Sequence, residues 1–327
     1  MTPLPVLAWR LLRFRVATMA LTFMLLGAAH PNGFPALSAD LLWAALALAA
    51  SYIAATSAND VADEAVDRIN HPGDAARPLV TGDASPRDMR VLHAVASGIA
   101  LAAAVLLGWQ AVIVTSVSLA IGVTYSLPPA RFSYRTWLAP LALAAAYVLV
   151  PYGLGAIATG RELVVADAWL ASALFALFLA RIVLKDYRDR AGDAAYGKPT
   201  LLLRFGSDAT CAVSLGALVA GNVLLLAALR PPLLVAVALE TLFVGVALLL
   251  RRLHAAADGR AEQVAIGLGA RLGNGVLLGV LAWLVLGGEG ASDGARAAFA
   301  WTLAALFGAS VAALAARPER VVIGYKG

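Results

Sequence analysis

The stretch LLWAALALAASYIAATSANDVADEAVD, residues 41–67, joins a long apolar run directly to a cluster of acidic side chains. The run that precedes Asp60 is as long as the roughly 20 apolar residues of a membrane-spanning helix. Asp60, Asp63 and Asp67 follow at spacings of three and four, which places their carboxylates on one face if the helix continues. The stretch therefore predicts a membrane helix that ends in an acidic site.

The composition of the whole chain extends this prediction. Of the 327 residues, 61% are hydrophobic and only 14% are charged, whereas soluble domains average about 25% charged residues. We expect an all-α, polytopic membrane helical bundle of about nine or ten transmembrane helices, with residues 1–327 forming a single domain. The expected spans cover approximately residues 14–30, 39–58, 88–107, 109–126, 137–158, 167–184, 208–228, 231–250, 264–287 and 296–315.

The distribution of Lys and Arg predicts how the bundle lies in the membrane. With the expected spans, 22 of the 25 Lys and Arg residues fall on the same side of the membrane as the N-terminus. The three exceptions are Arg161, Arg230 and Arg296. Because basic loops stay in the cytoplasm, both termini are expected there, and a bacterial plasma membrane is the expected location. The pI of about 9.6 follows from this topology, so no nucleic-acid partner is expected.

A second acidic cluster repeats the spacing of the first. KDYRDRAGD, residues 185–193, follows the sixth expected span and carries Asp186, Asp189 and Asp193. Like charges one helical turn apart repel each other, and a divalent cation is the natural compensation. Carboxylate oxygens favour Mg²⁺, Mn²⁺ or Ca²⁺, and Mg²⁺ commonly shares its shell with substrate phosphates. The two clusters thus predict a site for a Mg²⁺-chelated phosphate or diphosphate.

Basic and aromatic residues near the two clusters fit such a ligand. Arg77, Lys185 and Lys198 are interleaved with the aspartates and could neutralise a leaving diphosphate. A third loop, TYSLPPARFSYRTW at residues 124–137, supplies Tyr125 and Arg131. Tyr125 and Arg131 could face the diphosphate. They could also be the ordinary anchor pair of a membrane interface, and both interpretations remain open.

The motifs together resemble the UbiA superfamily of intramembrane prenyltransferases. NDVADEAVD at residues 59–67 is a complete NDxxDxxxD motif, and DYRDRAGDAAYGKPTL at residues 186–201 is similar to the family's second aspartate motif. The resemblance implies a bundle around a central cavity, in which Mg²⁺ ions hold an isoprenyl diphosphate donor. The reaction implied is transfer of the isoprenyl group to an aromatic or hydroxyl acceptor through an allylic cation, at the cytoplasmic side.

The resemblance also implies roles for individual residues. The implied metal ligands are Asn59, Asp60, Asp63, Asp67, Asp186, Asp189 and Asp193. The implied diphosphate-binding residues are Arg77, Arg131, Lys185, Lys198 and Tyr125. The implied catalytic residues are Asp63, Asp67, Asp189, Lys185 and Arg131.

Two alternatives to a prenyltransferase stay open. The same fold could capture the cation internally, which would make the protein a membrane terpene cyclase. The acidic clusters could also form a non-enzymatic site for divalent cations or lipid phosphates in a binding or transport protein.

Some polar residues lie inside the expected spans. Glu240 is expected to pair with Arg271 or Asn274 of the next helix, since buried intramembrane acids need a partner. Tyr147 and Tyr152 are expected to serve helix packing rather than to line a tunnel.

Overall fold

The computed structural model describes residues 2–31, 33, 36–288 and 292–317. Within these ranges the chain forms helices and no strand, and nine helices are long and apolar enough to cross a membrane. A tenth crossing results if the helices α1 (Leu4–Leu11) and α2 (Phe14–Ala29), which meet at an angle of 68°, count as one span. The expected all-α polytopic bundle is confirmed.

The helices have the following bounds in chain order. They are α1 (Leu4–Leu11), α2 (Phe14–Ala29), α3 (Ala39–Ala62), α4 (Glu64–Asn70), α5 (Pro78–Thr81), α6 (Pro86–Leu107), α7 (Trp109–Ser126), α8 (Leu138–Ala144), α9 (Val150–Ala158), α10 (Val165–Ile182), α11 (Asp186–Ala195), α12 (Leu201–Leu229), α13 (Leu233–His254), α14 (Gly259–Gly288) and α15 (Asp293–Ala315). A π-helical turn, Ala145–Leu149, joins α8 to α9.

Local sequence explains where these helices begin and end. The Ser38 hydroxyl accepts a hydrogen bond from the Leu41 N–H at the start of α3, and Ser85 and Asp88 form a capping box at the start of α6. Gly108, with φ of 104°, separates α6 from α7. The prolines that follow Arg230 separate α12 from α13. Both tight hairpins thus follow from residues that cannot continue a helix.

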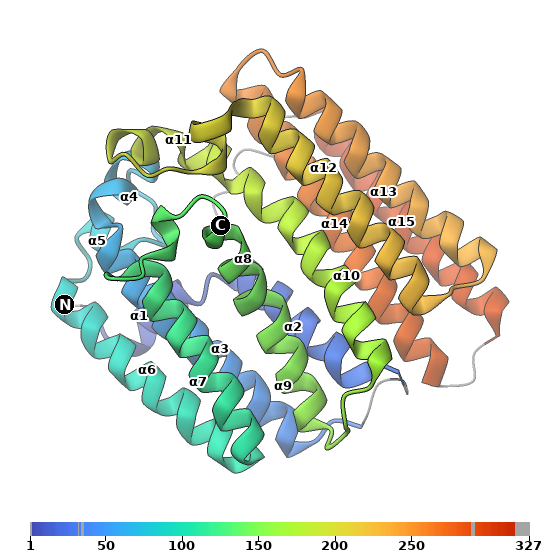
Figure 1. Ribbon diagram of the computed structural model, residues 1–327, viewed down its shortest axis with the longest axis horizontal. Helices are drawn as coiled ribbons and strands as arrows, with labels where there is room; N and C mark the ends of the chain where they lie inside the picture. The colour runs from blue at the N-terminus through green and yellow to red at the C-terminus, as the bar shows by residue number, and fades with distance from the viewer. Residues whose placement is uncertain (1, 32, 34–35, 289–291, 318–327) are drawn as a thin grey trace.

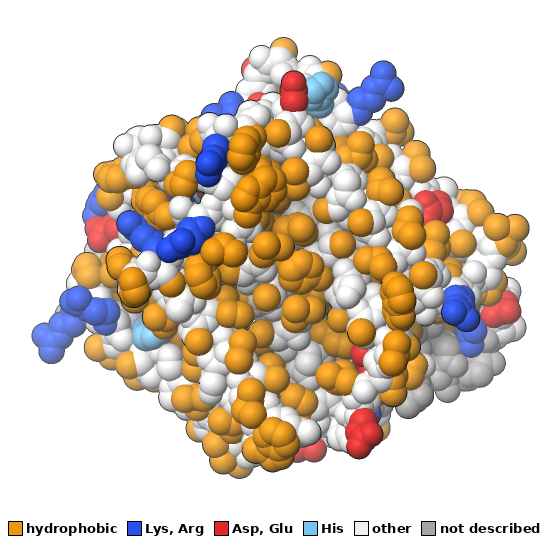
Figure 2. Space-filling model, viewed as in Figure 1, with side chains coloured by type: hydrophobic (Ala, Val, Ile, Leu, Met, Phe, Trp, Pro, Cys, Tyr) orange, Lys and Arg blue, Asp and Glu red, His pale blue; other side chains and the backbone are white. Residues whose placement is uncertain are grey.

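The long helices pack side by side, and the short helices α4, α5 and α11 gather at one end of the bundle (Figure 1). In the packing, α3 contacts α6 and α7, α2 contacts α9, α10 contacts α12, and α14 contacts α13 and α15. Figure 2 shows hydrophobic side chains across the middle of the visible face, with the charged side chains mostly near its margins. This distribution is the one expected of a bundle surrounded by lipid.

The close approach of α2 and α9 depends on glycine. A Cβ atom added at Gly27 would collide with the Tyr152 carbonyl, and one added at Gly155 would collide with the Met24 carbonyl. Small residues allow membrane helices to approach backbone to backbone. These two positions therefore fix one wall of the bundle.

The helices that lead into the two acidic motifs end in different ways. The second expected span does not continue through its acidic motif, because α3 ends at Ala62 and α4 begins at Glu64, with Asp63 non-helical at the junction. The break relieves the repulsion of stacked carboxylates and lets Asp60 and Asp67 reach the same arginine. By contrast, α10 continues through a 3₁₀ turn into α11. The helix α12 contains a kink at Gly206, with φ of 81° and ψ of 179°, so its long regular part begins next to the start expected near residue 208.

The expected partners of Glu240 are wrong. Its Oε2 accepts a hydrogen bond of 2.9 Å from Asn222 Nδ2 on α12. Arg271 instead donates to Ser310, and Asn274 accepts from Arg181. Arg271 and Asn274 line the central cavity, and Leu239, next to Glu240, packs against Gly279, further along α14.

Candidate active site

A cavity of about 580 Å³ lies inside the bundle, and both acidic motifs contribute to its wall. Asp63 and Asp67 reach it from the α3–α4 segment, while Asp189 and Asp193 reach it from α11. Segments more than 100 residues apart in the sequence are thereby brought to one place. The structure thus confirms the central cavity and places the two aspartate motifs around one end of it.

Arg77 organises the first motif. Its Nη1 donates to Asp60 Oδ1 at 2.6 Å and to Asp67 Oδ2 at 2.7 Å, and Arg13 Nη2 donates to the same Asp60 oxygen at 2.8 Å. Burial raises the pKa of the Asp67 carboxyl to about 6, although Arg77 acts in the opposite direction. The first motif is thus a set of buried carboxylates held by two arginines.

Lys198 connects the two motifs. Its Nζ lies 3.1 Å from Asp63 Oδ2 and 3.5 Å from Asp193 Oδ1. His71, just after α4, places Nε2 3.2 Å from Asp189 Oδ1 on α11. These contacts hold carboxylates of both motifs around a shared cluster of basic groups.

The backbones of the two acidic helices also approach closely. The Gly192 N–H donates to Asn70 Oδ1 at 2.6 Å. A Cβ at Gly192 would lie 2.6 Å from the Val66 carbonyl oxygen and 2.7 Å from Asn70 Nδ2. Glycine at this position therefore sets the separation between α4 and α11.

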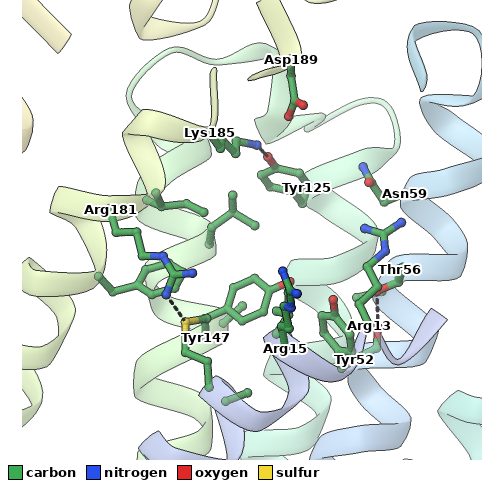
Figure 3. Close-up of a pocket in the computed structure, with 18 of the residues that line it drawn as sticks. Arg13, Arg15, Tyr52, Thr56, Asn59, Tyr125, Tyr147, Arg181, Lys185 and Asp189 are labelled. Atoms are coloured by element: carbon green, nitrogen blue, oxygen red, sulfur yellow. Dashed lines mark hydrogen bonds between the residues drawn. The ribbon is translucent and has the colours of Figure 1, made fainter. Parts of the chain in front are cut away.

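Next to the acidic end of the cavity, the side chains of Lys185 and Tyr125 meet. Lys185 Nζ, from the 3₁₀ turn before α11, donates to the Tyr125 hydroxyl at 3.0 Å, as Figure 3 shows. Asn59 Nδ2 donates to Asp63 Oδ2 at 3.1 Å. Asn59, Tyr125 and Lys185 line the cavity directly beneath the aspartates.

Aromatic side chains form the next layer. The Tyr147 ring stacks on Phe178 with centroids 5.5 Å apart and meets Tyr52 edge-on at 5.8 Å. All three line the cavity, so Tyr147 both packs against helices and faces the interior. Tyr152 behaves as expected, because it bonds to Asp167 in a cluster away from the cavity.

Three residues named from the sequence do not line the main cavity. Asp60 is covered by Arg13 and Arg77, and Asp186 lines a small side cleft together with Lys185 and Lys198. The Arg131 guanidinium stacks on the Tyr134 ring at 3.7 Å. A role for Arg131 at the diphosphate stays a prediction.

Other residues of the site were not singled out from the sequence. Arg13, Asn70, His71 and Gly192 all contact the acidic motifs. Asn70 and His71 follow the first motif directly and Gly192 lies within the second, so proximity to the motifs was the only signal available. Nothing in the local sequence indicates that Arg13 reaches Asp60.

The donor chemistry fits Mg²⁺. Asp63 lines the cavity, and its Oδ1 is buried and has no hydrogen-bond partner, which leaves a carboxylate oxygen for a cation. Asp60 Oδ2 also has no hydrogen-bond partner, but it lies behind Arg13 and Arg77. Among the described residues, no group of three or more His, Cys, Asp or Glu side chains is already placed around one point as a metal ligand set. Mg²⁺ does not need such a cage, because it binds through one or two carboxylates together with phosphate and water.

An apolar extension adjoins the main cavity. A second cavity of about 80 Å³ lies among α2, α10, α12, α13 and α14 and is lined by side chains such as Leu218, Phe243 and Ile266. Met19, Phe178 and Arg181 line both cavities. A hydrocarbon chain could therefore extend from the acidic end into this region.

These features define a class of protein: a membrane-spanning helical bundle whose paired acidic motifs lie at one end of an internal cavity. The chain belongs to the UbiA prenyltransferase family, whose model matches residues 16–275.

Similar proteins agree with this assignment. A digeranylgeranylglyceryl phosphate synthase from Methanoculleus marisnigri is 35% identical over 153 residues, which cover 45% of this chain and 50% of the relative. A homogentisate phytyltransferase from Synechocystis is 30% identical over 195 residues, covering 56% of this chain and 60% of the relative. The matched region thus spans about half the length of these curated relatives.

Solved structures show the same fold over most of the chain. A UbiA homologue from Archaeoglobus fulgidus, bound to GPP and Mg²⁺, has a TM-score of 0.60 at 17% identity and covers 97% of this chain and 99% of its own. A UbiA homologue from Aeropyrum pernix has a TM-score of 0.62 at 23% identity, covering 83% and 96%.

Proposed function

We propose that this protein transfers an isoprenyl group from an isoprenyl diphosphate to an aromatic or hydroxyl acceptor in a Mg²⁺-dependent reaction. The observation that supports this most strongly is the meeting of both aspartate motifs at one end of a cavity that adjoins a smaller apolar cavity. An isoprenyl diphosphate has a charged head and an apolar tail, which match the acidic end of the main cavity and the apolar cavity beside it. The names of the relatives, which denote geranylgeranyl and phytyl transfer, agree with such a donor.

The metal would be held by residues of both motifs. We assign Asn59, Asp60, Asp63 and Asp67 to one ion and Asp186, Asp189 and Asp193 to the other. When bound, Mg²⁺ neutralises the diphosphate and improves it as a leaving group.

The chain's own basic groups would hold the diphosphate and stabilise the charge that develops on it. The positions of Lys198 and Lys185 support this proposal, because each residue lines the cavity beside the aspartates. Arg77 would orient Asp60 and Asp67, since it already bonds both.

The aromatic layer would shelter the organic part of the reaction. Tyr52, Tyr147 and Phe178 present ring faces and edges to the cavity, and ring faces attract cationic groups. The bundle also keeps water from the allylic cation. The acceptor then forms a bond to the isoprenyl carbon and loses a proton, while the diphosphate leaves with the electron pair of the broken carbon–oxygen bond.

We also propose that the aspartate end of the bundle faces the cytoplasm, with both termini on that side. The distribution of Lys and Arg supports this orientation.

The test is diphosphate release by purified protein from geranyl, farnesyl and geranylgeranyl diphosphates, with Mg²⁺ or with a chelator, and with homogentisate or geranylgeranylglyceryl phosphate supplied as acceptor. Release is expected to require Mg²⁺ and to be lost in an Asp63→Ala/Asp189→Ala double variant. An Asp208→Ala variant is the matched control, because Asp208 is an exposed acid outside the cavity.

The same assay separates the alternatives. A prenylated acceptor supports the transferase. A cyclic hydrocarbon or alcohol formed without any acceptor would identify a terpene cyclase, and Mg²⁺ binding without turnover of any donor would favour a binding or transport protein.

A further inference from the structure

The second aspartate motif contains an aromatic residue whose side chain points away from the cavity. Tyr187 lies between Asp186 and Asp189 at the start of α11. At 100° per residue, its side chain projects about 100–160° around the helix from the three carboxylates of the motif. The residue is 4% exposed and does not line the main cavity. Tyr187 therefore contacts other parts of the protein rather than the space in which a donor would bind.

The hydroxyl of Tyr187 reaches a kink in α12. It lies 2.7 Å from Ser207 Oγ, donates to the Ser207 carbonyl oxygen at 3.4 Å and lies 3.4 Å from Cys211 Sγ. The kink is at Gly206, whose φ of 81° and ψ of 179° interrupt the helical conformation. Glycine is the residue that adopts such a positive φ without strain. The phenol thus binds α12 at the point where its regular part begins.

The helix α11 needs such contacts because it is short and carries like charges. It has ten residues, which is too few for an isolated helix to be stable in water. The carboxylates of Asp186, Asp189 and Asp193 also repel one another at their spacings of three and four residues. The order of this helix before any metal binds therefore depends on the elements packed against it.

Two other sides of α11 are also held. Asn70 and His71 connect it to the segment around α4, and Arg190 Nη2 lies 3.0 Å from Glu262 Oε1 on α14. The Arg190 side chain is 45% exposed, so solvent weakens this ion pair. The contact of Tyr187 with α12 is buried, and it holds the helix from the side that faces away from the cavity.

We propose that Tyr187 is a positioning residue for the metal site: its hydroxyl, bound to Ser207 at the α12 kink, keeps α11 in the orientation in which Asp189 and Asp193 line the cavity. This inference rests on the proposed Mg²⁺-dependent prenyl transfer and adds to it a residue outside the cavity. Without this anchor, Mg²⁺ would have to order the helix as it binds, and the cost of that ordering would lower its affinity. The reaction after Mg²⁺ has bound would be unchanged.

The experiment compares the full-length protein in detergent with Tyr187→Phe, Ser207→Ala and the double variant. Tyr196→Phe is the matched control, because Tyr196 directly follows α11 and is 48% exposed. Hydrogen exchange of the α11 amides, measured by mass spectrometry without Mg²⁺, reports the order of the helix. Calorimetric titration of Mg²⁺ alone reports the metal affinity. Diphosphate release at increasing Mg²⁺ concentration separates the apparent Mg²⁺ constant from kcat.

Tyr187→Phe is expected to exchange its α11 amides about 3-fold to 10-fold faster and to bind Mg²⁺ more weakly by a similar factor, the range for one lost hydrogen bond. Ser207→Ala should change both quantities less, because the Ser207 carbonyl still accepts from the phenol. The double variant should match Tyr187→Phe, since both substitutions act on the same contact. The kcat at saturating Mg²⁺ should stay close to the wild-type value, and Tyr196→Phe should match the wild type in every measurement.

Three results would overturn the inference. The first is exchange and Mg²⁺ affinity in Tyr187→Phe that equal those of the wild type. The second is faster exchange with unchanged Mg²⁺ affinity, which would limit Tyr187 to stabilising α11. The third is a fall in kcat that excess Mg²⁺ does not restore, the sign of a general fault in folding.

Failure of the proposed function would be visible separately. A wild type that binds no Mg²⁺ would overturn the proposed function together with the inference, and this result needs no variant. Failure of the inference alone appears only when the variants are compared with a wild type that does bind Mg²⁺. The exchange and calorimetric measurements contain neither donor nor acceptor, so they do not depend on finding the substrates.

Discussion

The Gly192 N–H donates a hydrogen bond to Asn70 Oδ1 at 2.6 Å, which joins the two acidic helices of the site. On α11 the contact lies between Asp189 and Asp193, and on the other side it is made by Asn70, the last residue of α4. The separation of the two motifs thus depends on a residue that carries no side chain.

A Gly192→Ala substitution is expected to weaken Mg²⁺-dependent donor binding by about tenfold or more, because the new methyl group would push α11 away from α4 and overpacking of this kind costs about 1–3 kcal/mol. Donor affinity measured by titration at fixed Mg²⁺ checks this. Gly216→Ala, at a helical glycine with no neighbour within 4 Å, is the control and should bind normally. Unchanged affinity in Gly192→Ala would mean that the two helices are free to separate.

The buried carboxyl of Asp67 should make Mg²⁺ binding sensitive to pH. Its pKa is raised from 3.8 to about 6 by burial, with Arg77 opposing. A raised pKa means that the carboxyl holds a proton below about pH 6, so Mg²⁺ must displace that proton there. Apparent Mg²⁺ affinity is therefore expected to fall about tenfold between pH 7.5 and about pH 5, more than an ordinary aspartate would cause.

Calorimetric titration of Mg²⁺ across this pH range measures the effect. An Asp67→Asn variant should bind Mg²⁺ more weakly and lose the steep part of the pH dependence. A flat profile in the wild type between pH 7.5 and pH 5 would contradict the prediction.

The α2–α9 interface offers a pair of substitutions in one helix. Gly155→Ala is expected to lower stability by about 1–3 kcal/mol, because the added methyl group collides with the Met24 carbonyl. Gly153→Ala should be neutral, since its nearest neighbour would be a Val114 methyl at 4.0 Å. Thermal unfolding in detergent compares the two variants, and equal melting temperatures would show that the helices can shift apart without cost.

A polar cluster away from the cavity should contribute to stability without affecting chemistry. Asp167 Oδ1 accepts hydrogen bonds from the Tyr152 hydroxyl at 2.6 Å and from Arg161 Nη2 at 2.7 Å, and it lies 3.0 Å from His30 Nδ1. Replacing Asp167 with Asn removes the negative charge that Arg161 faces. We expect a loss on the order of 3 kcal/mol, typical of a buried ion pair that loses one partner.

The unfolding temperature of Asp167→Asn checks this expectation. Asp40→Asn, which changes an exposed acid in the first turn of α3, should leave the unfolding temperature unchanged. If Asp167→Asn unfolded like the wild type, the cluster would contribute little beyond its packing.

The sequence predicts the bundle well because each span is a long apolar segment with clear boundaries. Gly108 and the prolines after Arg230 mark two hairpins directly. The aspartate motifs also predict where the acidic site lies, since regular spacing is visible without a structure.

Contacts between distant segments could not be predicted in the same way. The bond from Arg13 to Asp60, the pairing of Glu240 with Asn222 and the break at Asp63 all depend on how helices pack. Residues such as Arg271 illustrate the limit, because the sequence shows a polar residue within a span but does not show which neighbour or cavity it faces.

The bend between α1 and α2 has a practical consequence for handling the protein. Arg13 lies at this bend with φ of 43° and binds Asp60, while Arg10 of α1 binds Asp83. Any tag, deletion or crosslink that shifts α1 therefore disturbs an acidic ligand of the proposed metal site. Purification handles attached at the N-terminus should accordingly be removed before Mg²⁺ affinities are measured.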